Sequence, residues 1–157
     1  MQLIGTDLDS DAVDAARRGI YPSGIAADVS PALLEKYFTK KETTYRIHQE
    51  IREMAVFALQ NVIRDPPFTK LEILSCRNLL IYLDTDLQKQ LLPVFHYALK
   101  PGGLLFLGPS ETIGGFGDLF DTVNKKWKIF RRKEASPSVV HPMPQMPRSI
   151  LPSPEAR

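Results

Sequence analysis

The chain has 157 residues, of which 43% are hydrophobic and 24% are charged, and its formal net charge is +2. This composition fits one globular domain with a real core and excludes a fibrous protein. The nearly balanced charge gives no reason to expect nucleic acid as a partner. No apolar run approaches the roughly 20 residues that span a bilayer, and the residues after Met1 lack the basic and apolar regions typical of a signal peptide. We expect a cytoplasmic protein that does not enter a membrane, and the single cysteine agrees with a reducing compartment.

The first part of the chain has the pattern of a strand, a turn and a helix. An apolar strand at residues 2–6 is followed by a helix that Asp9 or Ser10 caps and that Gly19 ends. Residues 21–24 read as a turn. A serine–proline pair then predicts the start of a second helix, over residues 32–38.

The rest of the chain predicts a parallel sheet. Residues 45–61 mix strand and helix spacing, which indicates a small excursion. A strand at 71–83, a helix from Asp84 to Leu99 that the glycines after it end, and a strand at 104–107 form a βαβ unit. Residues 126–132 alternate as a final edge strand. The fold class is therefore α/β.

Prolines concentrate at the C-terminal end of the chain, where aliphatic residues are few. This composition predicts a disordered tail or linker over residues 134–157.

Polar residues interrupt the predicted strand at 71–83 and are the first candidates for a site. Arg77 and Asn78 stand in an otherwise apolar run, and Tyr82 follows in the same run. A buried guanidinium costs several kcal/mol unless it is paired or touches a ligand. Ligands of open α/β sheets bind at the carboxyl ends of the strands, so this position favours a binding site.

Other candidates have ordinary structural explanations. Asp7, at the end of the first strand, could accept hydrogen bonds from a ribose diol, but helix capping is the commoner use of aspartates there. Asn61 fits a turn, and Cys76 fits a small buried hydrophobe. The histidines lack metal-ligand spacing, so we expect no metal. The glycines at 113–117 do not follow a strand and open a helix, and therefore predict a flexible loop.

Basic residues cluster near the end of the predicted fold. This basic run could grip an acidic partner, but charged residues are a common protection of an edge strand against unwanted pairing. The run comprises Lys125, Lys126, Lys128, Arg131, Arg132 and Lys133.

Several motifs in a fixed order resemble CheR-type chemotaxis receptor methyltransferases. The resemblance covers about residues 1–133, and versions fused to a methylesterase domain and to PAS modules are the most similar. It implies a Rossmann-like methyltransferase domain that moves the methyl group of S-adenosylmethionine to glutamate side chains of a receptor. The motifs are Thr6-Asp7-Leu8-Asp9, Ala15-Ala16-Arg17-Arg18-Gly19-Ile20-Tyr21, Asp65-Pro66-Pro67-Phe68, Cys76-Arg77-Asn78-Leu79-Leu80-Ile81-Tyr82 and Leu99-Lys100-Pro101-Gly102-Gly103-Leu104-Leu105-Phe106-Leu107-Gly108-Pro109-Ser110-Glu111.

The resemblance also implies roles for individual residues. Asp7 would hold the ribose hydroxyls, and Asn61 with Val62 would line the adenosine. Arg77 and Asn78 would complete the cofactor pocket. Tyr82 would lie near the transferable methyl group and the incoming glutamate. Residues 24–61 would form an inserted β-subdomain that in some family members touches the receptor.

Family members carry, before the region that corresponds to residue 1, a helical domain and a first strand with a glycine-containing loop that cradles the cofactor. We therefore expect a domain truncated at its N-terminus, with strands at 2–6 and 71–83 that lack the neighbour between them. We expect this chain to bind S-adenosylmethionine poorly and to transfer nothing by itself. A non-catalytic docking module and a methyltransferase with another substrate remain alternatives.

Overall fold

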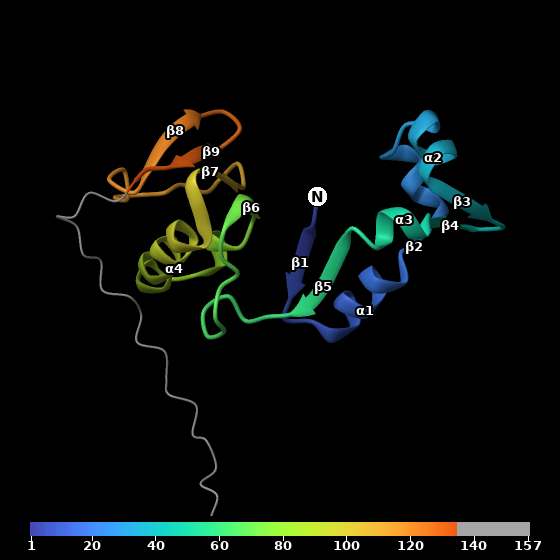
Figure 1. Cartoon of the computed structure of the whole chain (residues 1–157), viewed down its shortest axis with the longest axis horizontal. Helices are drawn as coiled ribbons and strands as arrows, with labels where there is room; N and C mark the ends of the chain where they lie inside the picture. Colours follow the sequence, from blue (N-terminus) through green and yellow to red (C-terminus); the bar gives the residue numbers. More distant parts are fainter. Residues whose placement is uncertain (135–157) are drawn as a thin grey trace, which may run out of the picture. The chain divides into compact units, whose positions relative to one another are not determined.

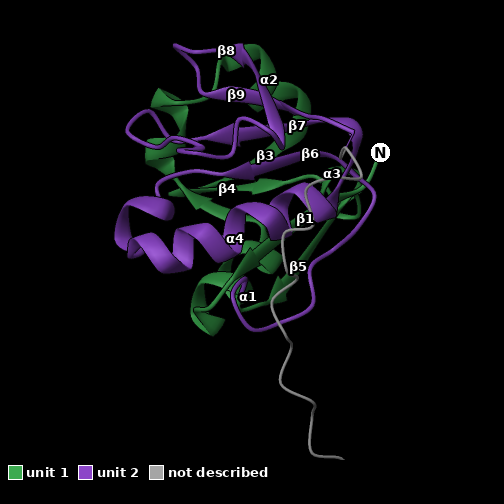
Figure 2. Ribbon diagram, turned by 90° about the vertical axis from the view of Figure 1, so that its left-hand side faces the viewer, with its two compact units in different colours: residues 1–61 green, residues 62–157 purple. Residues whose placement is uncertain are grey.

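A computed structural model of the chain describes residues 1–134, which form two compact units (Figures 1 and 2). Unit 1 comprises residues 1–61, and unit 2 begins at Val62. The predicted disordered tail, residues 134–157, lies outside the described residues from 135 onward. Within residues 1–134, no helix has the length and hydropathy to cross a membrane. The predicted insertion at 24–61 stays a prediction.

Unit 1 contains two small sheets. Strands β1 and β5 pair in parallel, and β2, β4 and β3 form an antiparallel sheet in that order. The elements of unit 1 are β1 (Leu3–Asp7), α1 (Ser10–Arg18), β2 (Ile20–Pro22), the 3-10 helix η1 (Ser23–Ala27), α2 (Pro31–Tyr37), β3 (Phe38–Lys41), β4 (Thr44–Ile47), α3 (Gln49–Arg52) and β5 (Ala55–Leu59).

The two predicted helices of unit 1 are confirmed, together with their caps. The Asp9 side chain accepts a hydrogen bond from the Asp11 N–H and is the N-cap of α1, whereas Gly19 ends the helix with a left-handed φ of 61°. Ser30 caps α2 in the same way, and its hydroxyl accepts from the Leu33 N–H. Local side-chain chemistry therefore sets both helix starts.

The predicted turn at residues 21–24 is wrong, because a strand and a 3-10 helix occupy these positions. Ile20–Pro22 form β2, with Tyr21 opposite Tyr45 in the antiparallel ladder, and η1 begins at Ser23. β2 lies at the edge of its sheet, where a proline without an N–H is tolerated. The pairing with β4 decides this segment, and no short-range pattern reports it.

Unit 2 is built on a four-stranded sheet with the order β6-β7-β9-β8. β6 and β7 are parallel and are connected through α4, so the predicted βαβ unit is confirmed. The elements of unit 2 are β6 (Leu71–Cys76), the 3-10 helix η2 (Leu80–Tyr82), α4 (Thr85–Ala98), β7 (Leu99–Leu107), β8 (Phe120–Asn124) and β9 (Ile129–Arg132).

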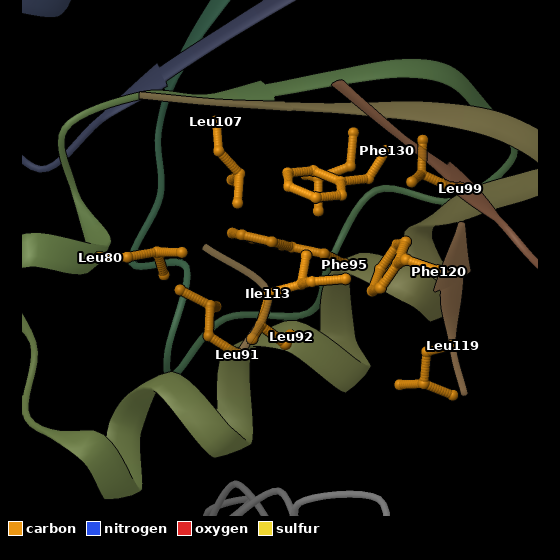
Figure 3. Packing of buried hydrophobic residues seen from close by; sticks show 11 residues of the cluster. Leu80, Leu91, Leu92, Phe95, Leu99, Leu107, Ile113, Leu119, Phe120 and Phe130 are labelled. Carbon is orange, nitrogen blue, oxygen red and sulfur yellow. The ribbon is translucent and has the colours of Figure 1, made fainter. Parts of the chain in front are cut away.

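One hydrophobic core holds unit 2 together. Figure 3 shows Leu91, Leu92 and Phe95 of α4 reaching toward Leu107 and Phe130 of the sheet. Each of these five side chains is at most 4% exposed. Burying such a side chain contributes about 1.5–3 kcal/mol, so the α4-to-sheet contact is the main source of stability in this unit.

Two features of the sheet differ from the sequence-based expectation. The final strand β9 is not at an edge, because it pairs with β7 on one side and with β8 on the other. Edge protection is therefore the wrong explanation of the basic run, and Arg132 instead donates a hydrogen bond to the Leu99 carbonyl. β7 also starts at Leu99 and includes the predicted helix-ending glycines. At Gly103 a Cβ would lie 2.9 Å from the Lys100 carbonyl oxygen, which explains the glycine.

Strands β1 and β6 are among the strands that have a partner on one side only within residues 1–134. β1 pairs with β5 alone, and β6 pairs with β7 alone. The expectation that these two strands lack a neighbour on one side agrees with this pairing. Backbone N–H and C=O groups along both edges are available to another strand.

Removal of the α4 cap should weaken unit 2. The Asp84 Oδ1 atom accepts a hydrogen bond of 2.8 Å from the Leu87 N–H. We expect Asp84→Ala to lower the free energy of unfolding by about 1 kcal/mol, as measured by urea denaturation followed by circular dichroism. Asn is an equally good cap, so Asp84→Asn is the matched control, and an equal loss in both variants would contradict the capping role.

Candidate functional site at the end of strand β6

The predicted polar residues lie just after β6 and not inside it. The strand ends at Cys76, so the prediction of one strand over residues 71–83 is wrong. Arg77 and Asn78 are both exposed, which also corrects the prediction that they are buried. Asn78 has a left-handed φ of 60°, and this conformation does not continue a strand. The expectation that these residues lie at the carboxyl end of a parallel strand is nevertheless right.

Glu111 explains why the chain turns here. Its buried carboxylate, 3% exposed, accepts hydrogen bonds from the backbone N–H groups of Asn78 at 3.0 Å, Leu80 at 2.7 Å and Gly108 at 2.6 Å. These N–H groups bond to the carboxylate and not to a carbonyl of a neighbouring strand, because a carboxylate is the stronger acceptor. We assigned no role to Glu111 from the sequence. Its position just after a buried strand is the signal that could have found it.

Arg77 rests on an aromatic ring and keeps its donors available. Its Cζ atom lies 4.8 Å from the centroid of the Phe106 ring, which belongs to the neighbouring strand β7. Among residues 1–134 no side chain or backbone group accepts a hydrogen bond from this guanidinium. A guanidinium carries five N–H donors, so this surface can bind a carboxylate or another acceptor.

Tyr82 ends the short helix η2 and points to solvent, with 81% of its surface exposed. Its backbone N–H donates to the Leu79 carbonyl at 3.0 Å, which fixes the turn. Arg77, Asn78 and Tyr82 are thus exposed residues of one short segment of unit 2, although Leu80 between them is buried.

Asp7 lies at the carboxyl end of β1, in unit 1. Its Oδ1 atom accepts a hydrogen bond of 3.0 Å from the Asp9 N–H, and its side chain is exposed. Asp9 is the helix cap, so capping does not explain Asp7. Its second oxygen, Oδ2, has no hydrogen-bond partner in the part of the chain that the structure describes.

Asn61 and Val62 stand where the two units meet along the sequence. Asn61 is half-buried at the end of unit 1 and has an interaction partner, and Val62 opens unit 2 and packs against its core. The six predicted residues therefore divide between the units, with Asp7 and Asn61 in unit 1 and the others in unit 2.

A surface hollow of about 400 Å³ in unit 1 contains none of the predicted residues. Residues of β3, β4 and α3 line it, and these are Thr39, Arg46, Ile47, His48, Gln49, Glu50 and Arg52. In the described segment 1–134 no group of three or more histidine, cysteine, aspartate or glutamate side chains could hold a metal ion.

Cys76 borders the turn but is not a nucleophile. Burial raises the pKa of the Cys76 thiol from 9.0 to about 12, and the negative charge of Glu111 adds to this effect. The thiol therefore stays protonated at neutral pH, and a protonated thiol is unreactive. The prediction that Cys76 is a small buried hydrophobe agrees with this environment.

Comparison with known proteins identifies the family. The family described as "CheR methyltransferase, SAM binding domain" matches residues 1–129. The chain belongs to this family of S-adenosylmethionine-binding domains. Membership confirms the resemblance seen in the motifs and agrees with the Rossmann-like α/β fold that we predicted from it.

Individual relatives span a wide range of lengths. An uncharacterized 104.1 kDa protein of Rhodobacter capsulatus is 37% identical over 131 residues, which are 83% of this chain and 14% of that protein. Chemotaxis protein methyltransferase 1 of Pseudomonas aeruginosa is 32% identical over 78% of this chain and 46% of its own length. The chemotaxis protein methyltransferase of Escherichia coli is 33% identical over 70% of this chain and 41% of its own length. The chain thus spans less than half the length of these relatives.

The thiol of Cys76 makes stability depend on pH above 9. Between pH 9 and 12 the unfolded state has lost a proton that the folded state keeps, so the free energy of unfolding falls as the pH rises. We expect the stability advantage of the unsubstituted chain over Cys76→Ala to shrink by about 1 kcal/mol between pH 8 and 10 in urea titrations. Below pH 9 both states hold the proton, and a difference that stays constant up to pH 10 would contradict the raised pKa.

Proposed function

We propose that the protein carrying this chain transfers the methyl group of S-adenosylmethionine to glutamate side chains of a chemotaxis-type receptor. Family membership and the names of the relatives support the reaction class. The observation that carries the proposal is the exposed turn after β6, where Arg77 offers hydrogen-bond donors at the carboxyl end of a parallel strand. Ligands of open α/β sheets bind at such ends.

The chemistry of the candidate residues, taken one unit at a time, suits the cofactor. The Oδ2 atom of Asp7 is available to a ribose diol. Asp7 is the last residue of the parallel strand β1, and Arg77 directly follows the parallel strand β6. Asn61 and Val62 line the adenosine in this proposal, while Arg77 and Asn78 bind the remaining polar groups. An exposed guanidinium stacked on Phe106 is already oriented, so little side-chain entropy is lost on binding.

The chemistry needs positioning more than acid–base catalysis. S-adenosylmethionine supplies a methyl group on a positively charged sulfur, and a glutamate carboxylate with a pKa of about 4.3 is ionised at neutral pH. The chain therefore has no need of a strong general base. Tyr82, exposed a few residues after Arg77, stands near the transferable methyl group and the incoming carboxylate in this proposal. Holding the reacting atoms in line is the source of the rate enhancement.

The partner in this proposal is a methyl-accepting receptor, and the reaction takes place in the cytoplasm. Fusion or association with methylesterase and PAS modules is part of the proposal. The 104.1 kDa relative, of which the chain covers 14%, supports it because a domain of this family occurs there in a much larger protein. The single cysteine agrees with a reducing compartment.

Two substitutions separate cofactor binding from methyl transfer. In the longest encoded polypeptide that contains this sequence, we expect Arg77→Ala to weaken binding of S-adenosylhomocysteine by more than about tenfold in calorimetry, because charge-assisted hydrogen bonds are lost. Tyr82→Phe should leave this affinity unchanged and slow the transfer. Transfer is measured as methanol released by base from a methylated receptor.

The control for this pair is Arg131→Ala, which removes an exposed arginine of β9 far along the sequence from the turn. It should change neither binding nor transfer. Equal loss of binding in Arg77→Ala and Tyr82→Phe would contradict the assigned roles. Failure of the unsubstituted polypeptide to bind S-adenosylhomocysteine would overturn the proposed function.

A further inference from the structure

We propose that Glu111 is a positioning residue whose carboxylate sets the place of Arg77 and Asn78. The placement of Arg77 and Asn78 is a property of unit 2. Its importance for binding a ligand rests on the proposed function. Glu111 does not touch the exposed surface, because only 3% of it is accessible. It acts through the backbone of the turn.

The carboxylate connects two loops that follow neighbouring strands. Its Oε2 atom accepts from the N–H of Asn78 after β6 and from the N–H of Gly108 after β7, while Oε1 accepts from the N–H of Leu80. Because β6 and β7 are parallel, both loops leave the sheet at the same end. One side chain therefore joins the two strand ends.

The hydrogen bonds offset a local cost. A non-glycine residue in the left-handed region, as Asn78 is, is less stable there than in an extended conformation and persists only where its surroundings hold it. A buried carboxylate is tolerated only when it is hydrogen-bonded. The left-handed backbone of Asn78 and the buried carboxylate of Glu111 thus stabilise each other.

Gly108 leaves the space that this contact needs. A Cβ at Gly108 would collide with the Asn78 side-chain oxygen and would lie 2.7 Å from Glu111 Oε2. Gly108 does not have a positive φ. A glycine is therefore needed here because a side chain would not fit, and not because of an unusual backbone conformation. Gly108→Ala should therefore displace the same turn as a change of Glu111, by a different physical route.

The position of Arg77 has a spectroscopic signature that needs no ligand. Because its guanidinium lies over the Phe106 ring, the Arg77 Nε–H proton should carry an upfield ring-current shift in the 157-residue chain. The N–H protons of Asn78, Leu80 and Gly108 should lie downfield, because bonds to a carboxylate are short and strong.

The test compares Glu111→Gln and Gly108→Ala with Glu72→Gln, an exposed glutamate of β6 that pairs with Lys100. Gln has one acceptor oxygen and an NH₂ group that faces the backbone donors, so it is a poor replacement. We expect both turn variants to lose the ring-current shift of Arg77, with the methyl resonances of Leu91 and Leu105 unchanged. In the longest encoded polypeptide their affinity for S-adenosylhomocysteine should fall about tenfold or more. Glu72→Gln should change none of these.

The outcomes separate this inference from the proposed function. An unchanged Arg77 signal in both turn variants overturns the positioning role, whatever the cofactor result. A lost Arg77 signal together with unchanged affinity also overturns it, since the placement would not matter for binding. A lost Arg77 signal in a polypeptide that never binds S-adenosylhomocysteine supports the positioning role and overturns the proposed function.

Discussion

The hydrogen bonds that Glu111 accepts from three backbone N–H groups are the constraint on which the candidate site depends. They end the β6 ladder at Cys76 and hold Asn78 in a left-handed conformation. Arg77 is consequently turned out of the sheet and onto the ring of Phe106. The apolar residues 79–83 that follow have the composition of a strand, and the hydrogen bonds to this carboxylate hold the chain in a turn instead. The exposure of Arg77, and with it any role in binding, follows from a single buried acid.

The core of unit 2 places that acid. Side chains of α4 pack against β7 and β9 in this core (Figure 3). β6 and β7 pair in parallel beside it, so the loops that follow them leave the sheet together. Parallel strands concentrate their functional loops at one end because the crossover helix occupies the return path. Unit 1 repeats this logic on a smaller scale, with Asp7 at the carboxyl end of β1 beside its parallel partner β5. The same topological rule thus presents a carboxylate in unit 1 and a guanidinium in unit 2.

Predictions from the sequence were right where the interactions involved join residues that are close along the chain. Asp9, one of two candidate caps, and the serine of the Ser30–Pro31 pair could be predicted because each bonds a backbone N–H two or three residues away. The sequence indicates neither strand β8 nor the interior position of β9, because strand order depends on partners far along the chain. Among site residues, Arg77 and Asn78 stood out as polar interruptions of an apolar run. The reason first given for them, burial inside a strand, was wrong.

The sequence by itself determined where α1, α2 and α4 begin, the βαβ unit, the α/β class and, through its motifs, the family. These features depend on local hydrogen bonds, on hydrophobic periodicity and on a fixed order of residues, all of which are written along the chain. Only the tertiary structure decided that the strand stops at Cys76, that Arg77 is exposed and that Glu111 is buried. The physical reason is the sequence separation of 31 to 33 residues between the carboxylate and its donors at Leu80 and Asn78. A contact of that range exists only once the core has brought the two strands together.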